Sequence, residues 1–153
     1  MKTSINTLLK RSDIWRIGQL PLSNRTAIST GFSALDQALP DHGWEQGALT
    51  EILSNEQGIG ELSLLMPALR QVSQSGKGIV LVAPPFMPFP QAWAAYGIHL
   101  QQLVIIRAHD NDQLWTLEQA ARAGSCGMLL GWSTHQHKHV CHYPGLPRLH
   151  LAA

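Results

Sequence analysis

The sequence is poor in charge and in cysteine, and it has no long apolar run. Charged residues make up 14% of its 153 residues, and the formal net charge is +1. It therefore lacks the basic field by which proteins usually hold duplex nucleic acid, and direct nucleic-acid binding is not expected. No apolar stretch reaches the roughly 18 residues of a membrane span. The two cysteines, Cys126 and Cys141, are too few for a disulfide framework and fit a reducing compartment.

The order of a secretory signal is also missing from the N-terminal stretch MKTSINTLLKRSDIW. Its short apolar part precedes Lys10 and Arg11, whereas in a signal peptide the positive charges come first. We therefore expect a cytoplasmic protein. With 44% apolar residues, the chain suits one ordinary domain with a real core and is too short for two.

The expected regions are an N-terminal helix with a linker, a patterned core, and an irregular histidine-rich tail, over residues 1–29, 30–132 and 133–153. The N-terminal helix covers 3–17, and the linker after it is rich in Gly, Pro, Asn and Ser. In the stretch STGFSALDQALPDHGW, Thr30 or Ser33 can cap a short helix that Pro40 ends.

From residue 48 onward, strand and helix patterns alternate. Strands are expected at 48–53, 78–83, 102–107 and 127–132, and helices at 61–73, 91–97 and 110–124. Pro67 should bend the first of these helices or mark its start. The alternation predicts an α/β fold, with a mostly parallel sheet and helices on both faces.

The stretch LTEILSNEQGIGELSLLMPALRQV has the strand–loop–helix layout of a phosphate-binding P-loop but lacks its chemistry. Asn55 stands where the first glycine belongs, and Gly60 is the closing glycine. Glu61 and Leu62 follow, where a lysine and a hydroxyl should hold the phosphates and magnesium. The later strand GMLLGW also ends without the expected carboxylate. The sequence therefore predicts a degenerate P-loop, with no nucleotide cofactor and no ATP hydrolysis.

The loop PPFMPFPQAW, residues 84–93, follows a strand that is expected to be buried. It should lie at the carboxyl edge of the sheet, where doubly wound folds place ligands. Phe86, Met87, Phe89 and Trp93 are candidate anchors for a protein partner, because aromatic residues dominate interface energetics. The alternative is that the loop folds these side chains back onto the helices.

For each residue that could act in catalysis or bind a metal, a purely structural role is the stronger interpretation. The residues His135, His137, His139, Cys141 and His142 could converge on zinc or nickel, but their spacing matches no known site, so we expect no metal.

Cys126 in GSCGMLL is expected to be a small core residue. Asp110 and Asp112 are expected at a helix start, where the helix dipole favours negative charge. Trp115, with Leu114 and Leu117, is expected to pack partly in the core. No catalytic residue is assigned, and a non-enzymatic protein is expected.

Taken in order, several blocks resemble one family. The opening segment STGFSALDQALPDHGWEQGALTEIL looks like the start of a RecA core. The runs GIGELSLLMPAL, VLVAPPFMPFPQAWAAYGI and LEQAARAGSCGMLLGW are similar to those of the SulA/ImuA family, and the likeness covers most of residues 30–132. The resemblance implies a RecA-like domain that has lost its nucleotide site and serves the SOS response to DNA damage.

Two roles are implied by this resemblance. ImuA-like members are accessory factors of translesion DNA synthesis, with an ImuB-like protein and an error-prone DNA polymerase as partners. SulA-like members inhibit cell division by binding FtsZ and blocking its polymerisation. The opening segment and the loop APPFMPFPQAW look closer to ImuA. A homodimer is left open, and a residual ATPase is disfavoured by Glu61 and Leu62.

The chain departs from the family at its end. Members typically continue with a full helix and at least one more strand. Here STHQHKHVCHYPGLPRLHLAA loses the pattern, and LPRLHLAA looks like the start of the expected helix, cut short. We therefore expect a C-terminus that is truncated or altered.

Overall fold

The computed structural model describes residues 26–54, 60–109 and 112–132. Its backbone forms two compact units, divided between Gln46 and Gly47. The expected helix over 3–17 and the histidine-rich tail lie outside the described residues. Within the described part, no helix has the length and apolar character to cross a membrane.

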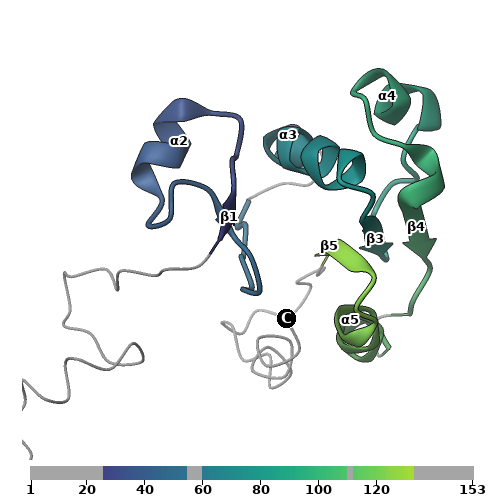
Figure 1. Ribbon diagram of the computed structural model, residues 1–153. Coiled ribbons are helices and arrows are strands. Elements are labelled where there is room, and N and C mark those ends of the chain that lie inside the picture. The colour runs from purple at the N-terminus through teal and green to yellow at the C-terminus, as the bar shows by residue number, and fades with distance from the viewer. Residues whose placement is uncertain (1–25, 55–59, 110–111, 133–153) are drawn as a thin grey trace, which may run out of the picture. The chain divides into compact units, whose positions relative to one another are not determined.

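The first unit holds one short helix and one short strand pair. Strand β1 (Ala27–Ile28) pairs antiparallel with β2 (Trp44–Glu45), and helix α2 (Ser33–Ala38) lies between them in the chain (Figure 1). Gly43 is required where the two segments meet, because a Cβ there would lie 2.4 Å from the Ile28 carbonyl oxygen. The sequence patterns did not predict this pair.

A polar cluster, and not a side-chain cap, holds the start of α2. The N-cap residue is Phe32 and no side chain caps the helix, so the expected capping by Thr30 or Ser33 is wrong. Instead the Asp36 carboxylate accepts hydrogen bonds from the Ser29 hydroxyl (2.7 Å) and the Thr30 N–H (2.8 Å). These bonds, the one from Ser29 first, lower the pKa of Asp36, because they stabilise its charged form.

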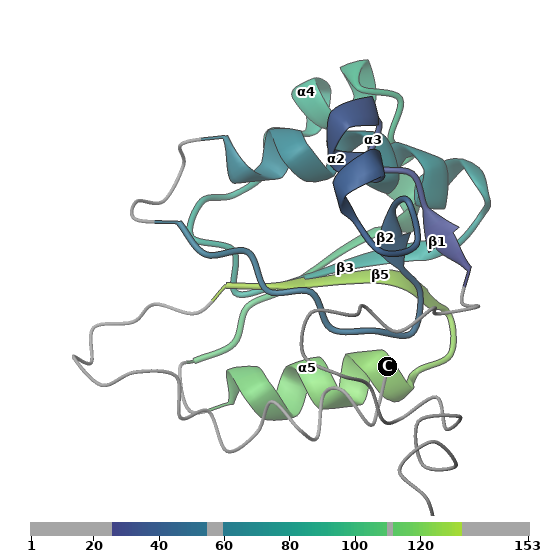
Figure 2. The ribbon, with the colours of Figure 1, turned by 90° about the vertical axis from the view of Figure 1, so that its left-hand side faces the viewer.

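The second unit is built on a three-stranded parallel sheet in the order β4-β3-β5. Its strands are β3 (Gly78–Val82), β4 (Leu103–Ile106) and β5 (Cys126–Gly131). Helices α3 (Glu61–Gln74) and α5 (Gln113–Arg122) cover opposite faces of the sheet (Figure 2). Helix α4 (Pro90–Ala95) and the 3₁₀ turn η1 (Leu100–Gln102) connect β3 to β4. The predicted α/β fold with a parallel sheet is confirmed.

The strand expected at 48–53 is not formed. Residues 48–54 are irregular, and Leu49, Ile52 and Leu53 are exposed. The alternation in ALTEIL records a preference for extended backbone, but a strand also needs a hydrogen-bonded neighbour. Among the described residues, the sheet of this unit offers only β3, β4 and β5.

Close packing of α3 against the sheet forms the core of this unit. Ala68 and Leu69 on the helix and Ile79 and Leu81 on β3 are all fully buried. The helix begins at Glu61, so the alternative start near Pro67 is wrong and the proline lies inside the helix.

The indole of Trp115 is exposed, which corrects the expected core packing, whereas Leu114 and Leu117 are half-buried. At roughly 100° per residue, position 115 points away from the stripe that positions 114 and 117 share.

Helix α4 ends in a Schellman motif that buries Trp93. The Ile98 N–H donates to the Trp93 carbonyl (3.2 Å), and the Gly97 N–H donates to the Ala94 carbonyl (2.9 Å). Gly97 has the positive φ of 83° that this motif requires. The buried Trp93 and Ile98 side chains flank the turn.

A buried hydroxyl joins the end of α3 to η1. Ser73 is fully buried, and its Oγ donates to Gln102 Oε1 at 3.0 Å and accepts the His99 N–H at 2.7 Å. Sequence patterns gave no sign of this link, because a serine in an amphipathic helix normally predicts an exposed position.

Candidate functional site

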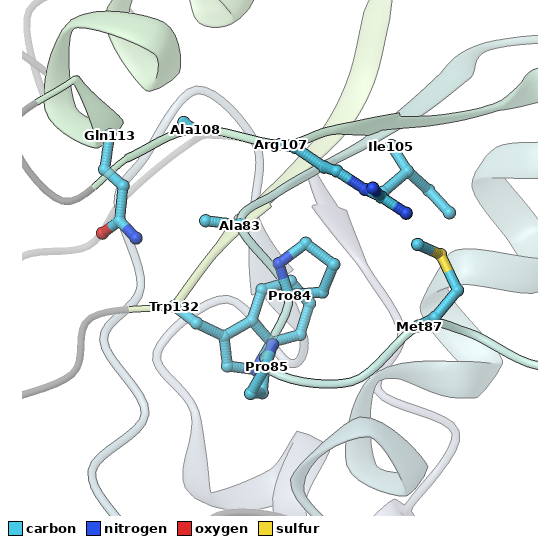
Figure 3. Close-up of a pocket in the computed structure, with 9 residues that line it drawn as sticks. All are labelled: Ala83, Pro84, Pro85, Met87, Ile105, Arg107, Ala108, Gln113 and Trp132. Atoms are coloured by element: carbon cyan, nitrogen blue, oxygen red, sulfur yellow. The ribbon is translucent and has the colours of Figure 1, made fainter.

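The residues that follow the three strands converge on one pocket at the carboxyl edge of the sheet (Figure 3). Ala83 and the two prolines after it leave β3, Arg107 and Ala108 leave β4, and Trp132 leaves β5. We call this the carboxyl-edge pocket. Its volume is about 340 Å³, and it is lined by Ala83, Pro84, Pro85, Met87, Ile105, Arg107, Ala108, Gln113 and Trp132.

The chain leaves β3 through an unusual backbone conformation at this pocket. Ala83 has a φ of +49°, in the left-handed region, and its N–H donates to the Ile106 carbonyl at 2.8 Å. For a residue with a Cβ this conformation costs about 1–2 kcal/mol. The prolines that follow fix the direction of the loop. Strained backbone of this kind gathers at functional sites, where surrounding structure holds it.

The lining is apolar except for one cation and one amide. Arg107 and Gln113 are the polar side chains, and the other seven residues offer hydrocarbon, proline rings, a thioether and an indole. In Figure 3, Arg107 extends to the same side of the pocket as Met87, and Gln113 lies on the opposite side. Arg107 is exposed and forms no ion pair with another described residue. The pocket can therefore pack apolar groups beside an anion.

Three of the four predicted anchors lie on the surface next to this pocket. Phe86, Met87 and Phe89 are 69%, 57% and 64% exposed. The expected alternative, in which the loop folds back, holds only for Trp93, which is 4% exposed and belongs to the core. Sequence reasoning missed Arg107 and Trp132. Both directly follow strands, and that position is the signal that could have found them.

The part of the predicted degenerate P-loop that the structure describes has a carboxylate at the start of α3. Gly60 is the N-cap of α3, with a φ of +113°, and its N–H donates to the Glu61 carboxylate at 3.2 Å. Leu62 is half-buried in the first helical turn, and Asn55 lies outside the described residues. The helix dipole favours an anion at this end, and Glu61 supplies one. Neither Glu61 nor Leu62 lines the carboxyl-edge pocket.

Other sequence candidates give no second site. Among residues 26–54, 60–109 and 112–132, no three His, Cys, Asp or Glu side chains come together as metal ligands. The histidine cluster and Asp110 lie outside the described residues, and Asp112 is the N-cap of α5 without a side-chain cap. Burial raises the pKa of the half-buried Cys126 thiol, which donates to the Met128 carbonyl at 3.3 Å.

A three-stranded parallel sheet with helices on both faces makes this an α/β fold similar to SulA and RecA-like folds. The structure resembles the crystal structure of SulA from Pseudomonas aeruginosa, with a TM-score of 0.53 and 22% identity, over 70% of this chain and 87% of that one.

In sequence, the chain is 25% identical to RecA of Thermus aquaticus over 134 residues, which is 85% of this chain and 39% of RecA. It is 25% identical to RecA of Clostridium acetobutylicum over 118 residues, which is 76% of this chain and 34% of RecA. The chain therefore spans well under half the length of the RecA proteins that it matches. No protein-family model matches it.

Proposed function

We propose that the chain is a non-catalytic, cytoplasmic protein of the SOS response that acts by binding other proteins at the carboxyl edge of its sheet. One observation carries this proposal. The edge at which doubly wound folds place ligands bears three exposed apolar side chains beside the carboxyl-edge pocket. Among the described residues that line the pocket there is no lysine, hydroxyl or carboxylate, and the lining combines Met, Trp and Arg, which are enriched at protein interfaces.

Within this class, an ImuA-like role in translesion synthesis is the function we favour. It is supported by the sequence likeness of the opening segment and of the loop 83–93 to ImuA. The partners would be an ImuB-like protein and an error-prone DNA polymerase. The chain would hold them together, and the partners would carry the chemistry.

A SulA-like role is the second candidate, and the structural likeness favours it. The SulA structure is matched over 87% of its length. In this role the chain would bind FtsZ, and occupying the surface needed for filament growth would be the whole mechanism.

Two binding assays on the full chain separate these roles. Sedimentation of FtsZ polymers with GTP should show a stoichiometric loss of polymer if the SulA-like role holds. Biolayer interferometry against the ImuB-like protein and the polymerase should show saturable binding if the ImuA-like role holds. If neither partner binds, the proposed function is refuted.

The binding surface is tested by the double variant Phe86→Ser/Phe89→Ser, which should weaken whichever interaction is found by at least tenfold. Its matched control is Leu53→Ser, because Leu53 is 75% exposed in the same unit but lies outside the loop that carries Phe86 and Phe89. Equal binding by both variants would contradict the assignment of this surface.

The absence of nucleotide chemistry is tested separately. Calorimetry with ATP and magnesium should give no binding heat for the wild-type chain, because Glu61 opposes phosphate and Leu62 cannot ligate magnesium. Wild-type binding of ATP would contradict the proposal. Any binding should require Glu61→Lys together with Leu62→Thr.

A further inference from the structure

We infer that the carboxyl-edge pocket is a receptor for an extended peptide segment in which an apolar side chain lies next to a carboxylate. This inference rests on the proposed function, because it names the chemistry of the partner that the surface would take. The apolar side chain would enter the pocket, and the carboxylate would pair with the Arg107 guanidinium.

The size and lining of the pocket favour a peptide over a nucleotide. Its volume of about 340 Å³ lies at the lower end of small-molecule sites and suits one or two side chains. Seven of its nine lining residues are apolar, and the proline rings and the Trp132 indole are stiff surfaces that lose little entropy on contact. No lysine or hydroxyl is present in the lining to hold a triphosphate.

The positive charge of Arg107 favours a ligand with a negative charge. Arg107 is the sole ionised side chain of the lining, and it is exposed without an ion-pair partner among the described residues. A guanidinium matches a carboxylate with two parallel hydrogen bonds, and a neighbouring apolar surface strengthens this pair by excluding water. A segment rich in Lys or Arg would be repelled.

The loop geometry keeps this receptor open before a ligand arrives. The left-handed backbone at Ala83 and the two prolines after it direct residues 84–87 out of the sheet. The Phe86 and Met87 side chains therefore stay exposed, and Phe89 extends the apolar surface along the same loop. A pre-formed site of this kind avoids part of the ordering cost of binding.

The test uses a fluorescein-labelled, amidated peptide, Gly-Ser-Asp-Leu-Phe-Asp-Ser-Gly, and fluorescence anisotropy with the full chain. We expect saturable binding that weakens about tenfold when both Asp are replaced by Asn, and by a similar factor when Leu and Phe are replaced by Ala. Arg107→Gln should weaken binding of the Asp peptide about tenfold and leave the Asn peptide unchanged. Raising the salt should weaken binding by the wild type more than by this variant.

The matched control is Arg122→Gln. It removes the same charge from the other end of α5, about 14 Å along the helix from the Gln113 end that reaches the pocket. It breaks an i,i+4 pair with Glu118, in which the Arg122 side chain is exposed and the Glu118 side chain is largely buried. We expect binding by this variant to stay within twofold of the wild type. Equal loss in the two variants would mean general charge attraction and would overturn the inference.

Two further outcomes would overturn it as well. One is no saturable binding of the peptide by the wild-type chain up to about 1 mM. The other is an FtsZ or ImuB-like partner that binds the wild type and Arg107→Gln equally, which would leave the proposed function standing and remove Arg107 from it. If neither partner binds the wild type while the peptide behaves as expected, the proposed function fails and the peptide receptor stands.

Discussion

The Ser73→Ala substitution tests the buried link between α3 and η1. It removes a hydroxyl that donates to Gln102 at 3.0 Å and accepts the His99 N–H at 2.7 Å, at a fully buried position. Each hydrogen bond contributes about 0.5–1.5 kcal/mol, and an N–H left unpaired costs about 1–3 kcal/mol. Alanine recovers about 0.5 kcal/mol through its higher helix propensity. The net loss should be about 1–2.5 kcal/mol.

Urea unfolding followed by circular dichroism measures this loss. With a slope of about 2 kcal/mol/M, the midpoint should fall by about 0.5–1.25 M. Ser63→Ala is the matched control, because Ser63 is exposed on the same helix and has no side-chain hydrogen bond to a described residue. It should leave stability unchanged or raise it slightly.

Amide hydrogen exchange at His99 gives a second, local readout. Exchange there should accelerate in Ser73→Ala and stay unchanged in Ser63→Ala, because only the first variant removes the acceptor of that N–H. If the free energies of unfolding of the two variants agree within about 0.3 kcal/mol and the His99 amide stays protected, the reasoning about this link is refuted.

Three further predictions concern backbone, packing and charge. Gly97→Ala should lower stability by about 1–2 kcal/mol in thermal unfolding, because φ is +83° and the new Cβ would lie 3.1 Å from Arg70 Nε. Gly131→Ala should cost about 1–3 kcal/mol in urea unfolding, because its Cβ would lie 2.8 Å from the Leu117 methyl carbons. The pKa of Asp36 is lowered on folding, so its contribution is present above about pH 4 and is lost as the pH falls further. Unfolding scans between neutral and acidic pH should show this loss, and Asp36→Asn should remove it. A wild-type slope retained in that variant, or alanine variants as stable as the wild type, would contradict these expectations.

Periodicity was sufficient to predict the α/β core. The expected helix at 61–73 is α3 at Glu61–Gln74, and the expected strand at 78–83 is β3 at Gly78–Val82. Both elements bury a continuous apolar face or run, and burial of that face is the dominant favourable term in folding. When many apolar side chains stabilise an element together, the apolar pattern alone is enough to predict that element.

The predictions from sequence were wrong or missing where an element or contact depends on how residues are placed in three dimensions. The segment 48–53 has strand-like alternation but no pairing partner among the described residues. Trp115 is predicted to share a helical pattern with Leu114 and Leu117, and this is wrong, because its angle on α5 places it off the buried stripe. The Ser73 link joins residues more than twenty positions apart, and only the folded chain brings them together.

The candidate site likewise has a part that lies on one segment of the sequence and a part that only the fold brings together. The exposure of Phe86, Met87 and Phe89 at this edge could be predicted, because one loop carries them and a buried strand before it fixes the edge on which they lie. Their role as anchors for a partner stays a prediction. The position after a strand places Arg107 and Trp132 at this edge as well. Their meeting in one pocket could not be predicted, because they follow different strands and come together only through the order β4-β3-β5.

Two features of the second unit oppose nucleotide binding: the Glu61 carboxylate at the start of α3, and the exposed apolar side chains at the carboxyl edge of the sheet. Three residues separate the end of α3 from the start of β3, so the helix runs back along the strand and its N-terminus lies toward the carboxyl edge. That helix end already holds the Glu61 carboxylate, which lowers its attraction for a bound phosphate. Exposed Phe and Met side chains at the carboxyl edge would also be a poor surface for a hydrated, highly charged triphosphate. Both features therefore favour an apolar ligand at this edge, and Arg107 offers a place for a single anion beside it.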